Sequence, residues 1–271
     1  MAQILGKIIS LFIGTVMSIN TWEMGIVQEE RNSLKGARIE EKIILEDITV
    51  AGYTLKKTTN TNTVTSKGWW KYPNEIKLTK RNGNDFLVLV NKEYRLTENY
   101  APNDLVSASK SGIRRGKNYQ IRNIIVNDLR DLVNQAKNDG IDLSIRSGYR
   151  SYADQLSTYN YWLSVNKNNP DEADKISARA GHSQHQLGTV VDFSSTEIQD
   201  GIGGRFHTTK AAKWLSENAW RYGFVISYPK GYESTTGYSY ESWHYRYIGI
   251  ANAQEMKSRG EILEIFLKGK N

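Results

Sequence analysis

The stretch 181-GHSQHQLGTVVDF-193 decides the fold of this chain, together with the short segment 241-ESWHYRY-247. Three of the four histidines in the sequence lie in these two segments, at His182, His185 and His244. In both segments polar side chains stand beside short apolar runs, a pattern typical of strands that present functional groups near their ends. We therefore expect strands that carry a metal site.

The residue types in these segments predict a catalytic zinc site. His185, Asp192 and His244 offer two neutral imidazoles and one carboxylate, a set that leaves one of the four zinc positions open for water. A fourth protein ligand would close the site and make it structural. Glu241, close to His244 in sequence, is then free to take a proton from a water whose pKa the metal lowers to about 7. We predict one Zn²⁺ per chain and Glu241 as the general base.

The spacing of these residues places conditions on the backbone. His185 and Asp192 are an odd number of residues apart, and on a straight strand they would face opposite sides. Gly188 lies between them and supplies a turn that can re-aim the chain. Glu241 and His244 are also an odd number apart. We therefore expect Glu241 on the approach loop and His244 on the strand proper.

Other polar residues fit the needs of peptide hydrolysis. A tetrahedral intermediate requires a positive charge or hydrogen-bond donors at its oxygen, and Arg150, between a strand-like segment and a helix, is the candidate. Gln155 lies on the following helix, and Ser183 lies beside the first ligand segment. Both are expected to hydrogen-bond the substrate. We do not expect His182 or His207 to bind metal.

Hydrophobic periodicity predicts a mixture of helices and strands, and therefore an α+β fold. Ser151 is a suitable N-cap for one helix, and either Thr208 or Thr209 is a suitable N-cap for another. A charged loop is expected over residues 170–180. The expected strands are 86–90, 141–145, 224–228 and 243–247, and the expected helices are 121–136, 151–165, a segment from Thr209 to near Gly223, and 261–268.

Composition narrows the class of protein. The chain has 271 residues and no cysteine, which excludes a disulfide framework and cysteine-ligated metal. Its formal net charge of +7 comes from scattered basic residues that form no stripe along a helix or loop, so we expect no nucleic-acid partner. A basic surface also suits anionic cell-wall polymers or an anionic membrane face.

The N-terminus carries a compartment signal. Lys7 precedes an uncharged apolar run from Ile8 to Ile19, which is shorter than the about 20 residues that span a bilayer and is typical of a secretory signal. Uncleaved, the same run could serve as an N-terminal membrane anchor. We predict a protein of the bacterial cell envelope, exported or N-terminally anchored. Its expected parts are a signal peptide or anchor (1–25), an N-terminal region of unknown role with a few strands or a loosely structured spacer (26–85), and a catalytic zinc domain (86–271).

Three motifs in this order resemble the VanY-type D-alanyl-D-alanine carboxypeptidases, which are grouped with related L,D-carboxypeptidases, lysostaphin and hedgehog. The motifs are Ser147-Gly148-Tyr149-Arg150-Ser151-Tyr152 with Gln155, Ser183-x-His185-x6-Asp192, and Glu241-x-Trp243-His244. The resemblance covers roughly residues 86–250. It implies a compact domain with a mainly antiparallel sheet and flanking helices. It also implies His185, Asp192 and His244 as zinc ligands, Glu241 as base, Arg150 beside the polarised carbonyl, and Ser183 and Gln155 on the substrate.

The expected function is removal of a C-terminal D-alanine from peptidoglycan stem peptides, with D,D- or L,D-specificity, by Glu-assisted attack of zinc-bound water. A stem-peptide endopeptidase is an alternative. It would need a groove open at both ends, whereas a carboxypeptidase needs a pocket with a cation for the terminal carboxylate. A non-catalytic, zinc-containing wall-binding module is another, although it has little need of Glu241. The segment Ser164-Val165-Asn166-Lys167 matches Ser-x-x-Lys, but the partner motifs of a serine peptidase are absent from the sequence.

Overall fold

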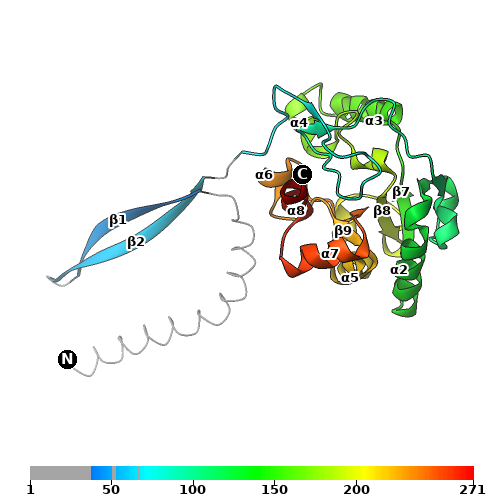
Figure 1. The fold of residues 1–271 in the computed structure, drawn as a ribbon. Helices are drawn as coiled ribbons and strands as arrows, with labels where there is room; N and C mark the ends of the chain where they lie inside the picture. Colours follow the sequence, from blue (N-terminus) through cyan, green and yellow to red (C-terminus); the bar gives the residue numbers. More distant parts are fainter. Residues whose placement is uncertain (1–37, 51–52, 66–67) are drawn as a thin grey trace. The chain divides into compact units, whose positions relative to one another are not determined.

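The structure of the chain is a computed structural model that describes residues 38–50, 53–65 and 68–271. It divides into two units, residues 1–68 and 69–271. In the first unit, strands β1 (Arg38–Val50) and β2 (Tyr53–Thr65) pair as an antiparallel hairpin, drawn in blue in Figure 1. Both strands lie in the N-terminal region, and of the two alternatives predicted there they match the strands. The expected signal peptide or anchor lies outside the described residues.

The second unit begins at Trp69, ahead of the boundary expected at Phe86. Strand β3 (Lys77–Leu78) pairs in parallel with β4 (Tyr94–Arg95), and the Tyr72 hydroxyl lies 3.0 Å from that of Tyr238. These contacts explain why the residues just before Phe86 belong to this unit. Within the described part of the chain, no helix is long and apolar enough to cross a membrane.

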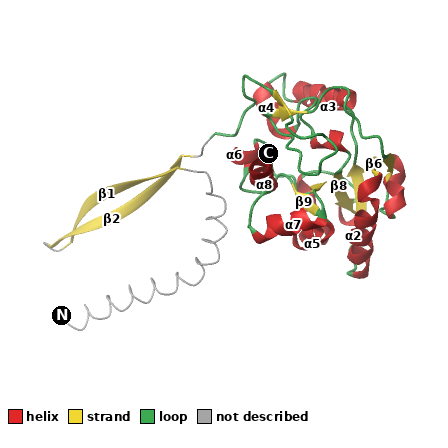
Figure 2. Ribbon diagram, in the orientation of Figure 1, coloured by secondary structure: helices red, strands yellow, loops and turns green. Residues whose placement is uncertain are grey.

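A four-stranded antiparallel sheet in the order β7-β8-β10-β9 forms the centre of the second unit (Figure 2). Its strands are β7 (Leu143–Ser147), β8 (Val190–Ser195), β10 (His244–Tyr247) and β9 (Phe224–Ile226). A smaller antiparallel pair joins β5 (Leu105–Ser107) to β6 (Gln120–Arg122). The expected α+β class with a mainly antiparallel sheet is confirmed.

Successive side chains of a strand point to opposite faces, and this alternation separates core from site. On β8 and β10, Val191, Phe193, Tyr245 and Tyr247 enter a buried cluster with residues of two helices, α2 (Val126–Asn138) and α5 (Lys210–Asn218). The intervening residues of the same strands face the other way. On these two strands the packed core therefore lies on one face, and Asp192, Ser194, His244 and Arg246 lie on the other.

Helices surround this sheet. Ser151 and Thr209 cap two of them as expected, because their hydroxyls accept hydrogen bonds from the backbone N–H groups of Asp154 and Ala212 at 3.1 and 3.0 Å. Helices α5 and α7 lie near β9 (Figure 1). The α-helices are α2 (Val126–Asn138), α3 (Tyr152–Val165), α4 (Pro170–Ile176), α5 (Lys210–Asn218), α6 (Glu233–Thr236), α7 (Ile250–Ser258) and α8 (Leu263–Lys270).

The strand expected at residues 86–90 is wrong, although the segment is largely buried. Its backbone groups bond to a local turn and to side chains instead of a neighbouring strand: the N–H groups of Leu87 and Val88 donate to Asp85, and the guanidinium group of Arg246 donates to two of its carbonyl groups. That group donates to the carbonyl oxygens of Phe86 and Val88, at 3.1 and 2.6 Å. A continuous apolar run predicts that a segment is buried. In this case the buried segment does not pair with another strand.

Two further expectations need correction. The loop expected over residues 170–180 begins with helix α4, because the Asn169 side chain caps the Asp171 N–H at 3.0 Å and Pro170 occupies the first turn. The helix expected from Ile121 begins only at Val126, since the residues before it form β6 and a 3₁₀ turn.

Candidate metal centre and active-site pocket

A short 3₁₀ helix, Gln184–Leu187, carries the first candidate ligand. The hydroxyl of Ser183 caps this helix by accepting the His185 N–H at 3.3 Å. Gly188 ends it in the left-handed conformation at φ 68°, after which the chain enters β8. A Cβ atom at Gly188 would lie 2.9 Å from the Cγ of Arg122, so the turn requires glycine. The expected role of Gly188 as the turn is confirmed.

The second segment also has the expected geometry. Glu241 lies in the loop before β10, and His244 is the first residue of that strand. The backbone N–H of His244 donates to the Glu241 carbonyl at 3.2 Å, which closes a tight turn. This turn brings two side chains that an extended strand would separate to the same side.

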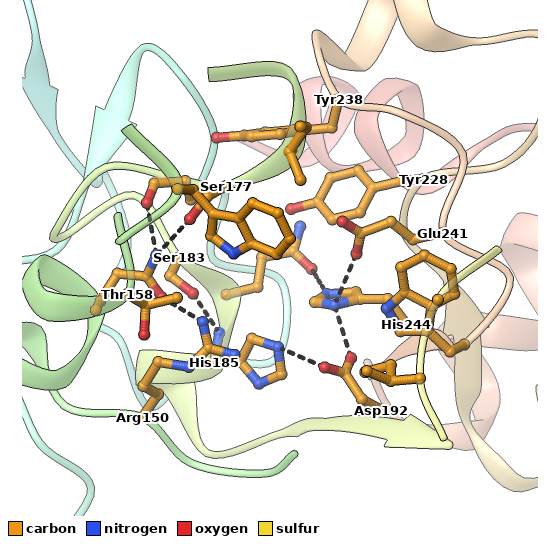
Figure 3. Close-up of a pocket in the computed structure, with 18 residues that line it drawn as sticks. Arg150, Thr158, Ser177, Ser183, His185, Asp192, Tyr228, Tyr238, Glu241 and His244 are labelled. Carbon is orange, nitrogen blue, oxygen red and sulfur yellow. Dashed lines mark hydrogen bonds and ion pairs between the residues drawn. The ribbon is translucent and has the colours of Figure 1, made fainter. Parts of the chain in front are cut away.

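Three side chains converge on one point in Figure 3. One ligand atom each from His185, Asp192 and His244 lie within 4.8 Å of one another, and all three residues are buried. The Nε2 of His185 is 3.3 Å from Asp192 Oδ2, and the Nδ1 of His244 is 3.0 Å from Asp192 Oδ1. An oxygen of Glu241 lies 3.5 Å from the same Nδ1 of His244.

Hydrogen bonds on the far side of each imidazole fix which nitrogen faces the cluster. His185 donates from Nδ1 to the carbonyl oxygen of Gly148 at 2.7 Å, and this leaves a lone pair on Nε2. His244 Nε2 lies 3.4 Å from the amide oxygen of Gln184, which also accepts the Ser227 hydroxyl at 2.7 Å. The Nδ1 lone pair of His244 therefore points into the cluster. Outer partners of this kind orient metal-binding histidines.

The donor set fits a divalent cation. Asp192 Oδ1 is buried and accepts no hydrogen bond, although His244 Nδ1 is only 3.0 Å away, because both atoms present lone pairs to the same space. A cation between them would satisfy both. Burial lowers the pKa of His185 to about 4, so the ring is neutral, as a ligand must be. Two imidazoles and one carboxylate are ligands that zinc accepts with an open fourth position.

Glu241 has the environment of an acid–base group. Its side chain is largely buried beside the cluster. Burial, followed by the negative charge of Asp192, raises the pKa of Glu241 well above its usual range. A carboxyl group with a raised pKa is a stronger base than an ordinary carboxylate and holds an accepted proton more readily.

Arg150 lies on the His185 side of the pocket, with its guanidinium group held in place (Figure 3). It donates to the Gln155 amide oxygen at 2.7 Å and to the Ser147 hydroxyl at 3.2 Å. The Gln155 amide nitrogen donates in turn to the Ala178 carbonyl at 2.5 Å. Both ends of the Gln155 amide are thus engaged by protein, an arrangement that orients Arg150.

The candidate ligands, Glu241 and Arg150 line one cavity of about 420 Å³. Ser183 lines it, as expected for a substrate contact, and so does Gln155. His182 and His207 lie elsewhere, with their Nδ1 atoms against the carbonyl oxygens of Asn91 and Gly204. The remaining lining residues are Arg150, Thr158, Trp162, Ile176, Ser177, Ala178, Gln184, His185, Asp192, Ile202, Gly203, Tyr228, Tyr238, Glu241, Trp243 and His244.

Sequence reasoning missed several of these residues. Gln184 stands between two candidate site residues, and this position is a signal that could have found it. Tyr228 lies at the end of a predicted strand, and its ring centroid is 4.9 Å from that of His244. The glycine-rich segment with Ile202 and Gly203 gives no sequence signal for a place in the pocket.

Comparison with known proteins gives consistent matches. The sequence model of the family described as "VanY: D-alanyl-D-alanine carboxypeptidase" matches residues 118–250. The protein YodJ of Bacillus subtilis (strain 168) is 35% identical over 205 residues, which cover 73% of this chain and 74% of YodJ. The LdcB LD-carboxypeptidase structure superposes with a TM-score of 0.62 at 29% identity, covering 83% of this chain and 94% of LdcB.

A further solved structure is a mutant of the vancomycin-resistance D,D-pentapeptidase VanY from the VanB-type resistance cassette, in complex with Zn(II). It matches with a TM-score of 0.56 and 31% identity over 67% of this chain and 98% of that one. The motifs, the fold and the matched length agree. This chain is an enzyme of the VanY family of D-alanyl-D-alanine carboxypeptidases.

Proposed function

We propose that this protein is a zinc-dependent carboxypeptidase that removes the C-terminal D-alanine from peptidoglycan stem peptides. The observation that carries the proposal is the convergence of His185, Asp192 and His244, with Glu241 3.5 Å from the His244 ring nitrogen. The Zn(II) complex of the related VanY pentapeptidase supports zinc as the ion. The donor atoms and their outer hydrogen bonds fit one Zn²⁺ per chain.

Each residue has a chemical task in this proposal. His185, Asp192 and His244 hold the metal, which when bound supplies Lewis-acid polarisation of a carbonyl and of a water molecule. Glu241 takes the proton of the attacking water and returns it to the leaving amine nitrogen. The raised pKa of Glu241 suits both transfers, because the group must gain and then lose the same proton.

Arg150 is the cation of the pocket: within the described residues, no other lysine or arginine lines this cavity. Held by Gln155 and Ser147, it stabilises the negative charge that develops on the carbonyl oxygen. Ser183 and Gln155 are the substrate-holding residues of the proposal, with Gln155 also orienting Arg150.

The alternatives differ in their products. A D,D-carboxypeptidase removes one alanine from a pentapeptide stem, an L,D-carboxypeptidase removes one from a tetrapeptide stem, and an endopeptidase cuts inside the stem. A wall-binding module releases nothing. Incubation with defined tri-, tetra- and pentapeptide stems, followed by mass spectrometry, separates these cases. We expect loss of one terminal D-alanine, abolished by chelator and restored by zinc. Internal cleavage, or intact peptides with zinc present, would contradict the proposal.

We also propose that the protein acts in the cell envelope, with residues 1–25 as its signal peptide or membrane anchor. The apolar run from Ile8 to Ile19 supports this, as does a substrate class that lies outside the cytoplasm. Cell fractionation with mass analysis of the N-terminus tests it. We expect the protein in the envelope or secreted fraction, whereas an intact chain confined to the cytoplasmic fraction would overturn it.

A further inference from the structure

The segment after β8 leaves the sheet close to Asp192 and returns to the pocket. Ile202 and Gly203, in this segment, line the same cavity as His185 and Glu241. Ile202 is 48% exposed, a large apolar side chain left open to solvent at the pocket. Because ligand pockets are lined largely by apolar side chains, a half-exposed isoleucine in this lining can contact a bound ligand.

A set of polar contacts fastens the base of this segment to the sheet. The guanidinium group of Arg114 donates two hydrogen bonds to the Asp200 carboxylate, and the Ser144 hydroxyl donates a third at 2.8 Å. The Ser194 hydroxyl on β8 donates to the Gly201 carbonyl. The bidentate pair is geometrically specific and partly buried, with 14% of the Asp200 side chain exposed. We call Arg114 and Asp200 the loop clamp.

The sheet side of the clamp is itself fixed. The Arg114 carbonyl accepts the backbone N–H of Ile145 on β7 at 3.1 Å, and Arg114 forms a β-bridge with Ser144. The Arg114 Nε also reaches Asp142 at 3.1 Å, an exposed contact that does not involve the loop. The clamp therefore ties the loop to a strand of the central sheet.

Backbone strain in the segment after β8 indicates that surrounding contacts hold it in this conformation. Gln199 and Asp200 adopt φ 56° and 57°, two successive non-glycine residues in the left-handed region. Each costs about 1–2 kcal/mol relative to ordinary backbone. Gly203 has φ 112° and ψ −163°, a conformation that essentially only glycine adopts. Strain persists where surrounding contacts over-determine it, and here the clamp does so next to a functional pocket.

We propose that Ile202 is a specificity-determining residue that packs against the side chain of the residue preceding the terminal D-Ala-D-Ala unit, and that the loop clamp positions it. This inference rests on the proposed function. The alanine methyl groups are too small to cover an isoleucine at the open part of the pocket. The first substrate side chain able to do so is the one before them. An aliphatic side chain there is the chemical class that Ile202 recognises.

The test compares two acylated tripeptides, one with an aliphatic lysine-length side chain and one with glycine before D-Ala-D-Ala. The ratio of their kcat/KM values reports the contact. For Ile202→Ala we expect this ratio to fall about fivefold, through a higher KM for the aliphatic peptide, since a lost apolar contact at a half-open site is worth less than one in a closed pocket. Arg114→Ala should lower the same ratio, and Arg114→Lys should partly restore it. The double variant should show little further loss.

Two controls match these variants. Ile265→Ala removes an isoleucine of similar exposure, 44%, from α8 outside the cavity, and should leave the ratio unchanged. Asp142→Ala removes the other partner of Arg114 without touching the loop, and should do the same. A ratio unchanged in Ile202→Ala, or equal losses for both peptides, overturns this inference alone. A wild-type protein that releases D-alanine from a tetrapeptide stem but from neither of these peptides also overturns this inference alone. A wild-type protein that binds zinc and hydrolyses none of the three overturns the proposed function.

Discussion

Asp192 on β8 and His244 on β10 are direct partners across the antiparallel sheet, and their facing atoms Oδ1 and Nδ1 are 3.0 Å apart. Sheet register alone thus places two candidate ligands from distant parts of the chain side by side. A slip of one residue would turn either side chain into the core face. His185 joins them from the 3₁₀ helix before Gly188. The metal centre is therefore as rigid as the sheet that carries it.

Replacing Asp192 by Asn should abolish tight zinc binding, because it removes the only carboxylate among the three converging side chains. The loss should exceed the about 10–100-fold typical of an outer partner. Zinc affinity and stoichiometry, measured by competition with a chelating dye, check this. His207→Ala is the matched control, since His207 lies outside the cluster, and it should keep one zinc per chain. Equal zinc binding by Asp192→Asn would remove Asp192 from the ligand set.

Gln184 should matter for zinc affinity although it is not a ligand. Its amide oxygen lies 3.4 Å from His244 Nε2 and is held by Ser227, so it selects the ring tautomer that turns Nδ1 toward the metal. Gln184→Leu should weaken zinc binding about 10–100-fold. Gln184→Glu keeps an acceptor at the same place and should retain most of the affinity. Unchanged binding in the leucine variant would show that the ring needs no such partner.

His182 should make the protein less stable in acid. Burial lowers the pKa of its imidazole from 6.5 to about 4, and its Nδ1 donates to the Asn91 carbonyl at 2.7 Å. Between pH 6.5 and 4 the unfolded chain therefore binds more protons than the folded one, and stability falls as the pH falls. At about 1.4 kcal/mol per pH unit the loss reaches up to about 3 kcal/mol.

Denaturant unfolding of the chelated protein at several pH values measures this effect. His182→Asn has no group that titrates there, so its free energy of unfolding should change less between pH 6.5 and 4 than that of the parent. Parallel curves for the two proteins would mean that His182 does not titrate in this range.

Gly188→Ala should destabilise the fold more than Gly140→Ala. Both glycines have positive φ, 68° and 76°, and an alanine at either costs about 1–2 kcal/mol in backbone strain. At Gly188 a Cβ would also lie 2.9 Å from Arg122 Cγ and 3.1 Å from Leu105 Cδ2, whereas nothing lies within 4 Å at Gly140. Urea denaturation of both variants isolates the steric part. Equal destabilisation would show that Arg122 and Leu105 move aside at little cost.

The sequence alone predicts the metal segments well because their information is local. Residue type and order predicted His185, Asp192, His244 and Glu241 as site residues, and the structure brings these side chains together. Gly188 lies where the sequence predicts a turn. The N-caps at Ser151 and Thr209 are equally local, since each bonds a backbone group three residues away. For most segments with strong hydrophobic periodicity, the same local information also predicted whether the segment is a helix or a strand.

The errors arose where tertiary contacts override local pattern. The buried run at residues 86–90 is bonded by Arg246, which lies far away in sequence. The engagement of Gln155 with Arg150, and the partnership of Gln184 with His244, depend on how separate elements meet. The position of Ile202 depends on a clamp to Arg114, and no sequence period encodes it.

The most direct measurement of the central claim is the activity and zinc content of Glu241→Gln. The variant keeps the shape of the side chain and removes its ability to carry a proton. We predict one zinc per chain, affinity close to that of the parent, and a rate of D-alanine release lower by about 10²–10⁴. Full hydrolytic rate with zinc bound would contradict the assignment of Glu241 as the base, and with it this account of the active site.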